Sequence, residues 1–149
     1  MSTHHQGTGE ERAALDVYIK LSRAANAVTN RINAHLADVN LTISQFGVLE
    51  SLYHLGPMHQ NVLGEKILKS SGNMTLVIDN LVKRGLVERR RDEQDRRYIQ
   101  VYLTEAGKEL IDDIFPRHVK IVVNEMQILS SAEKKQLARL CRKVGLQDM

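Results

Sequence analysis

The sequence predicts a mainly α-helical fold with a small β-wing, and two observations carry this prediction. Apolar residues recur at spacings of three and four through most of the 149 residues, which is the period of helices that bury one face. Between residues 86 and 103 the period changes to two, which is typical of strands. The apolar share of 42% is ordinary for a globular protein, and the length fits one domain. We therefore expect a single domain over residues 1–149.

The two ends of the chain are predicted to form long helices. Residues 10–38 repeat apolar side chains along one stripe, with no glycine or proline between them. A helix of that length spans roughly 40 Å, which is more than a compact lobe of this size can cover. Residues 107–146 continue the helical pattern, with a kink or local unwinding expected at Pro116 and a capping box at Ser130 and Glu133. We expect both segments to be dimerisation helices that pack against a second copy of the chain.

Shorter helices are predicted between these segments. Thr42 and Gln45 are spaced as a capping box, and the helix that they begin ends at a Gly-Pro pair, residues 56–57. A short helix follows over about residues 60–68, and residues 69–72 form a tight polar turn. This turn leads into the clearest amphipathic helix of the sequence.

This amphipathic helix ends at Gly85, where a left-handed backbone is needed. Its buried stripe is expected to consist of Met74, Val77, Ile78, Leu81 and Val82. Its opposite face carries Asn73, Thr75, Leu76, Asp79, Asn80 and Lys83. A short helix, a glycine-containing turn and a second helix together form a helix-turn-helix.

A basic hairpin follows directly. Residues 86–90 and 98–103 can form its two strands, joined by a charged tip. Between Lys83 and Arg97, seven basic residues outnumber four acidic ones, an excess equal to the +3 net charge of the whole chain. Such a local cluster is the electrostatic footprint of a polyanion site, although a solvated charged turn has the same composition.

A helix-turn-helix followed by a basic hairpin is a winged helix, here over about residues 42–104. Its second helix fits the major groove of DNA, and its hairpin can reach phosphates or a minor groove. The helix N-terminal amides, with Ser71 and Thr75 beside them, can approach phosphate oxygens. The sequence therefore predicts binding to double-stranded DNA. The alternative is a winged-helix module that binds another protein and no DNA.

The run from Leu81 to Leu110 resembles the wing and following helix of the MarR family of bacterial transcription regulators. The resemblance rests on Asp95-Arg96-Arg97, Ile99, Val101, Leu103-Thr104 and Gly107, and upstream on residues 45–49 and Ser71-Gly72. It covers nearly the whole chain. It implies a ligand-responsive repressor that binds a pseudo-palindromic operator as a homodimer.

The resemblance also assigns roles to residues of the wing. It implies that Arg97 enters the minor groove and that the Asp95 carboxylate holds it there. Amide and hydroxyl side chains of the amphipathic helix are expected to read base edges, while its basic residues set affinity. The complete set of expected DNA contacts is Ser71, Gly72, Asn73, Thr75, Leu76, Asn80, Lys83, Arg84, Arg90, Asp95, Arg96 and Arg97.

A finer resemblance concerns residues 64–68, the Ser71-Gly72 pair and residues 114–118. These look like the family branch that represses quinone and catechol detoxification genes. They imply a small aromatic or phenolic effector. The residues expected to contact it are His35, His54 and His118. Ordinary surface or core positions remain the simpler interpretation of these histidines.

Several classes of function are not expected. The only cysteine, Cys141, lies on the apolar stripe of the last helix, which favours a buried thiol over a redox sensor. The histidines lack metal-ligand spacing, so we expect neither a metal nor a cofactor. We expect a cytoplasmic protein with no membrane partner, because the sequence contains neither a signal peptide nor a spanning segment. The motifs of the common enzyme classes are absent, so we expect no catalytic residues.

Overall fold

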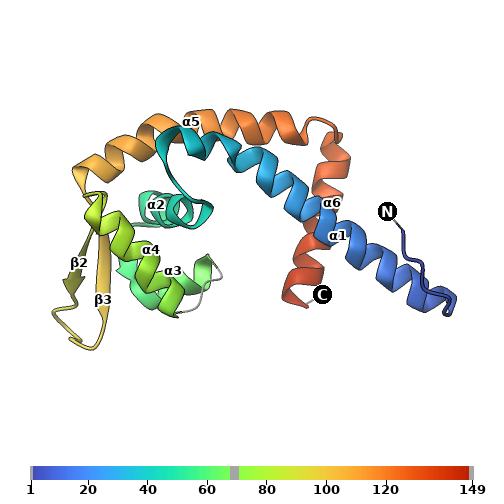
Figure 1. Ribbon diagram of the computed structural model, residues 1–149, viewed down its shortest axis with the longest axis horizontal. Coiled ribbons are helices and arrows are strands. Elements are labelled where there is room, and N and C mark those ends of the chain that lie inside the picture. Colours follow the sequence, from blue (N-terminus) through green and yellow to red (C-terminus); the bar gives the residue numbers. More distant parts are fainter. Residues whose placement is uncertain (1, 68–70, 148–149) are drawn as a thin grey trace. The chain divides into compact units, whose positions relative to one another are not determined.

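The computed structural model describes residues 2–67 and 71–147, whose elements are labelled in Figure 1. It is mainly helical with a small antiparallel sheet, so the predicted fold class is confirmed. The chain forms two compact units. The central unit is Ala34–Arg117, and the terminal unit joins Met1–Asn33 to His118–Met149. No helix among the described residues is long and apolar enough to cross a membrane.

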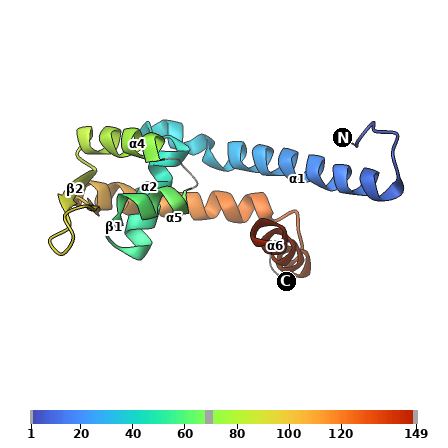
Figure 2. The ribbon, with the colours of Figure 1, turned by 90° about the horizontal axis from the view of Figure 1, so that it is seen from below.

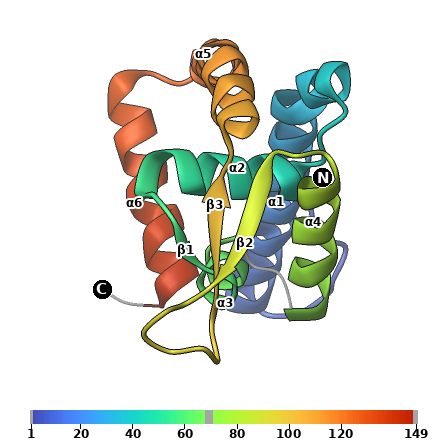
Figure 3. The same cartoon turned by 90° about the vertical axis from the view of Figure 1, so that its left-hand side faces the viewer.

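The central unit contains the helix-turn-helix and the wing. Its elements are η1 (Ala34–Val39), α2 (Ile43–Leu55), β1 (Met58–His59), α3 (Gln60–Lys66), α4 (Ser71–Lys83), β2 (Val87–Arg91), β3 (Ile99–Leu103) and the first part of α5 (Glu105–Met126). Figure 3 shows β3 between β1 and β2, with the hairpin loop extending beyond the strands. The hairpin register pairs Val87 with Leu103 and Arg91 with Ile99. Met58 pairs with Val101, which adds the third strand.

Local hydrogen bonds begin and end these helices where the sequence predicts. The Thr42 hydroxyl accepts from the Gln45 N–H at 3.1 Å, and the Gln45 side chain accepts from the Thr42 N–H at 3.0 Å, which completes the capping box. Gly85 has a φ of +72° after the end of α4, as its left-handed turn requires. At the start of α5, a Cβ on Gly107 would lie 2.0 Å from the Leu86 carbonyl oxygen, so only glycine lets α5 pack this closely.

The core of the central unit is formed by one side of each element. Its buried apolar residues are Leu36, Leu41, Phe46, Val48, Leu49, Leu52, Leu63, Met74, Ile78, Leu81, Leu86, Val87, Val101, Ile111 and Ile114. The prediction for Val82 was wrong, because this side chain is 38% exposed. Leu81 occupies the inward position in this turn of the helix. Because consecutive helical side chains point about 100° apart, Val82 is turned away from the core.

Some predicted element boundaries also need correction. The α-helix predicted over residues 10–38 ends at Asn33, and the tighter η1 continues to Val39. Of the turn predicted at residues 69–72, residues 69 and 70 lie outside the described residues, whereas Ser71 and Gly72 belong to the first turn of α4. The local unwinding expected at Pro116 does not occur: α5 remains helical through this exposed position, where water can satisfy the carbonyl that loses its N–H partner. The kink expected there as the alternative stays a prediction.

The terminal unit consists of α1 (Gly9–Asn33), the remainder of α5 and α6 (Ser131–Leu146). Figure 2 shows α1 as one extended helix. The Arg31 side chain donates from Nε to Glu125 Oε1 at 2.7 Å, which joins α1 to α5. The predicted capping box at Ser130 and Glu133 is present at the start of α6. The structure describes α1 and α6 along their whole length, and no residue of either helix is buried.

Candidate nucleic-acid interface

The polar face of α4 carries the residues predicted to read base edges. Asn73, Thr75 and Leu76 are exposed, and Asn80 is half-buried. The buried stripe of α4, centred on Met74, Ile78 and Leu81, fixes which face remains outside. The structure places Ser71 and Gly72 in the first turn of the same helix. Lys83 is exposed in the last turn.

The tip of the wing holds one arginine in a fixed orientation. Arg97 donates from Nε to Asp95 Oδ1 at 2.9 Å and from Nη2 to Asp95 Oδ2 at 2.7 Å, a bidentate pair. The hydrogen bond from the Arg97 side chain lowers the pKa of Asp95 below its ordinary value, and the Arg97 backbone N–H adds to this effect. The side chain of Arg97 is 83% exposed. Arg96, beside it, is also exposed.

A second cluster orders the turn that carries this pair. Asp92 Oδ2 lies 2.7 Å from His59 Nε2, and Asp92 Oδ1 accepts from the Gln94 N–H at 2.8 Å. These bonds favour the ionised carboxylate, with His59 contributing most, so the pKa of Asp92 is lowered. The His59 ring stacks on Tyr98 with centroids 4.8 Å apart and planes 2° apart. The sequence pattern did not predict this cluster, because β1, the two-residue strand that carries His59, was not predicted.

Arg90 and Arg91 lie on the last residues of β2. The Arg90 guanidinium pairs with Glu88 and lies 4.4 Å from the ring centroid of Tyr102. Arg91 donates to the Arg96 carbonyl at 2.6 Å. An open, polar cleft of about 360 Å³ runs along these side chains. Asp92 and Glu93 also line this cleft, so both basic and acidic side chains lie along it.

Arg84 makes a structural contact that the sequence did not predict. It donates from Nη1 to the Asn40 carbonyl at 2.7 Å and from Nη2 to the Val39 carbonyl at 3.1 Å. These carbonyls end η1, whose last carbonyl groups lack helical partners. These two hydrogen bonds join η1 to the end of α4, while Arg84 itself remains exposed.

The three histidines predicted to contact an effector lie in different surroundings. His35 is only 7% exposed and packs edge-on against Phe46 within the core. His54 is exposed, with its ring centroid 4.7 Å from that of Phe115. Its neighbour Tyr53 donates to Asp112, and this bond raises the pKa of the Tyr53 hydroxyl. His118 is half-buried and belongs to the terminal unit.

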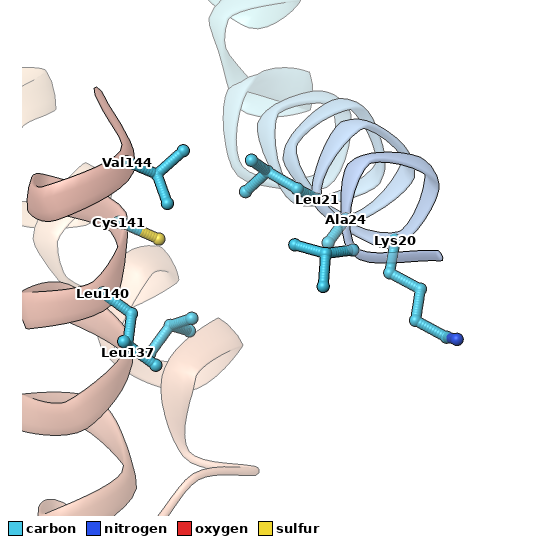
Figure 4. Close-up of a pocket in the computed structure, with 8 residues that line it drawn as sticks. Lys20, Leu21, Ala24, Leu137, Leu140, Cys141 and Val144 are labelled. Carbon is cyan, nitrogen blue, oxygen red and sulfur yellow. The ribbon is translucent and has the colours of Figure 1, made fainter. Parts of the chain in front are cut away.

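Cys141 is exposed, so the expectation of a buried thiol was wrong for the single chain. It lies on an apolar groove of about 380 Å³ between α1 and α6 of the terminal unit. Figure 4 shows side chains from the two helices facing each other across this groove. The groove is lined by Val17, Lys20, Leu21, Ala24, Leu137, Leu140, Cys141 and Val144. The apolar stripe of α6 was correctly identified, but it faces this groove rather than a packed core.

Comparison with known proteins gives consistent results. Residues 41–99 match the MarR family. The chain is 35% identical over 133 residues to the HTH-type transcriptional regulator MhqR of Bacillus subtilis (strain 168), covering 89% of this chain and 92% of that protein.

Two solved structures are also similar. BpsR of Bordetella bronchiseptica, whose structure concerns regulation of its DNA binding by 6-hydroxynicotinic acid, has a TM-score of 0.79 at 27% identity, covering 87% of this chain and 92% of BpsR. A MarR mutant from E. coli, complexed with operator DNA, has a TM-score of 0.75 at 26% identity, covering 85% of this chain and 94% of that one.

Proposed function

The chain belongs to the MarR family of DNA-binding transcriptional regulators, and on that premise we propose that it is a cytoplasmic, ligand-responsive repressor that binds a pseudo-palindromic operator as a homodimer. The observation that carries this proposal is the bidentate pair that fixes Arg97 at the tip of an exposed wing, beside a helix with an outward polar face. The alternative, a winged-helix module that binds another protein and no DNA, leaves the basic hairpin unexplained.

In the proposed complex, α4 lies in the major groove and the wing follows the adjacent backbone. Amide side chains of α4 pair with base edges, while Arg97 enters the minor groove, where a narrow groove has an enhanced negative potential. The proposed contacts are Ser71, Gly72, Asn73, Thr75, Leu76, Asn80, Lys83, Arg90, Asp95, Arg96 and Arg97. Arg84 belongs to the same proposed set, because it remains exposed while two of its donors hold the end of η1.

The proposed homodimer forms through the predicted segments 10–38 and 107–146, chiefly through those parts of them that belong to the terminal unit. Large apolar side chains of α1 and α6 remain exposed, including Val17, Tyr18, Leu140 and Val144. Contiguous exposed apolar surface of this kind marks an interaction site. A second copy would fill the groove between the two helices, and its two-fold symmetry would match two operator half-sites.

Selection of duplexes from a random library tests DNA reading directly. We expect the protein to enrich an inverted repeat whose half-sites are separated by about one helical turn, because each copy presents one α4. Binding should weaken steeply with salt, since Lys and Arg side chains displace counterions from phosphates. Enrichment of a single half-site, or of no sequence at all, would contradict the proposal. A reporter gene placed behind the enriched duplex then separates repression from activation.

We propose a small aromatic acid or phenol as the effector, which binds without forming a covalent bond. The similarity to BpsR, whose DNA binding 6-hydroxynicotinic acid regulates, supports this class of compound. Such a ligand releases DNA only if it binds the DNA-free form more tightly. His54 is the first contact to test, because it is exposed beside Phe115.

Operator release should be measured with a panel of salicylates, catechols and quinones. We expect release by at least one salicylate or catechol, weakened in His54→Ala and unchanged in Cys141→Ser. A quinone whose effect is lost in Cys141→Ser would instead identify the exposed thiol as the sensor. The absence of release by every compound would remove ligand control from the proposal.

A further inference from the structure

Arg89 is the basic residue of the hairpin with the largest number of polar partners outside the wing. It lies in the middle of β2 opposite Val101, and residues paired across antiparallel strands project to the same face of the sheet. Because Val101 is fully buried, Arg89 points toward the helices rather than outward as Arg90 does. Its side chain is 26% exposed.

The guanidinium of Arg89 binds three acceptors on two helices. Nε donates to Gln60 Oε1 at 3.1 Å, at the start of α3. Nη2 donates to the Thr75 carbonyl at 3.2 Å, and Nη1 lies 2.7 Å from Asp79 Oδ1, both on α4. Thr75 and Asp79 are four residues apart and therefore lie on one face of α4. Among side chains, only a planar guanidinium can donate hydrogen bonds to three acceptors in this arrangement.

Gln60 closes this arrangement into a ring. Its Nε2 donates to the Thr75 hydroxyl at 3.1 Å, while its Oε1 accepts from Arg89. The Gln60 side-chain amide therefore connects the two residues, because its N–H binds Thr75 and its oxygen binds Arg89. The orientation of the Thr75 hydroxyl and the axial position of α4 are both tied to the wing through Arg89.

We propose that Arg89 is a positioning residue that locks α4 to the wing and thereby sets which bases α4 reads. This inference rests on the proposed function, in which α4 enters the major groove. Base readout requires side chains within hydrogen-bond distance of the correct base edge, so a small rotation of α4 lowers discrimination. Phosphate contacts tolerate such a rotation far better, because phosphates surround the groove regardless of sequence. Arg89 therefore acts on specificity rather than on overall affinity.

The test uses the full-length protein and the duplex that it selects from a random library, with a scrambled duplex for comparison. In Arg89→Met we expect discrimination between the two duplexes to fall about tenfold, at the base pairs beneath α4. The salt dependence of binding should keep its slope, because no phosphate contact is lost. Arg89→Lys should recover only part of the discrimination, since an ammonium cannot address three acceptors.

Arg90→Met is the matched comparison, because it removes the same side-chain type from the adjacent position on the opposite face. It should reduce the salt slope by about one while leaving base preference unchanged. Asp79→Asn provides a second route to the same result if Arg89→Met does not fold, and it should also lower discrimination.

Other outcomes would overturn the inference. A shallower salt slope with unchanged preference in Arg89→Met would show that Arg89 itself contacts phosphate. Unchanged slope and unchanged preference would show that the Arg89 network has no role in recognition. Failure of the unsubstituted protein to select any duplex would instead contradict the proposed function.

Discussion

Replacement of Leu140 by glutamate should convert the protein into a monomer. Leu140 is 41% exposed in the single chain and lines the groove between α1 and α6. In the proposed dimer this side chain is covered by the second copy, and a carboxylate buried there without a partner costs several kcal/mol. Loss of the dimer removes the second half-site contact, so affinity for the operator should fall by about 10²–10⁴-fold. Light scattering gives the mass, and titration with the selected duplex gives the affinity.

Arg139→Glu is the control for this prediction. Arg139 is adjacent to Leu140, but one helical residue turns the side chain by about 100°, away from the apolar stripe. Although this substitution changes the charge by more than Leu140→Glu does, we expect it to leave the dimer intact. If Leu140→Glu remained a dimer, the groove between α1 and α6 would not be the dimer surface.

The sequence was most informative where a structure is determined within a few residues. The two capping boxes, at Thr42 and Ser130, each depend on a hydroxyl and on a side chain three residues later. The turn at Gly85 likewise depends on one residue that tolerates a positive φ. Such features require no knowledge of distant contacts, and they were predicted correctly.

Two of the missed features depend on distant partners. His59 and Asp92 are 33 residues apart, and they meet only because β1 adds to the hairpin as a third strand. A two-residue strand carries no period of its own, so the sequence pattern could not predict it. Arg84 binds carbonyls more than 40 residues earlier in the chain, and this contact was missed for the same reason.

Cys141 illustrates a different limit. The spacing of Leu137, Leu140, Cys141 and Val144 correctly indicated one apolar face of a helix. Periodicity identifies a face that avoids water, but it does not say whether the same chain or another one covers that face. In the single chain Cys141 is exposed, and the proposed second copy would cover it. Prediction of burial from a stripe therefore requires knowledge of the oligomeric state.

Replacement of Arg97 by alanine should weaken binding to every duplex, by about 1–3 kcal/mol, while leaving the fold almost unchanged. Arg97 is highly exposed, and an exposed ion pair contributes at most about 1 kcal/mol to stability. The slope of the salt dependence should fall by about one, because a cation in the minor groove also displaces counterions from the duplex and is lost in the variant. Thermal unfolding checks that the stability of the fold is almost unchanged. Titration with duplexes over a range of salt concentrations measures the loss of affinity and the change in slope.

Asp95→Ala distinguishes a positioned arginine from simple electrostatic attraction. If only net charge mattered, removal of a carboxylate from the wing tip would strengthen binding to a polyanion. We expect the opposite, because Asp95 accepts both hydrogen bonds that orient Arg97, and a freed guanidinium loses entropy when it enters the groove. In the Arg97→Ala background, however, Asp95→Ala should no longer weaken binding and should slightly strengthen it. A single Asp95→Ala variant that binds more tightly would show that Asp95 does not position Arg97 for DNA.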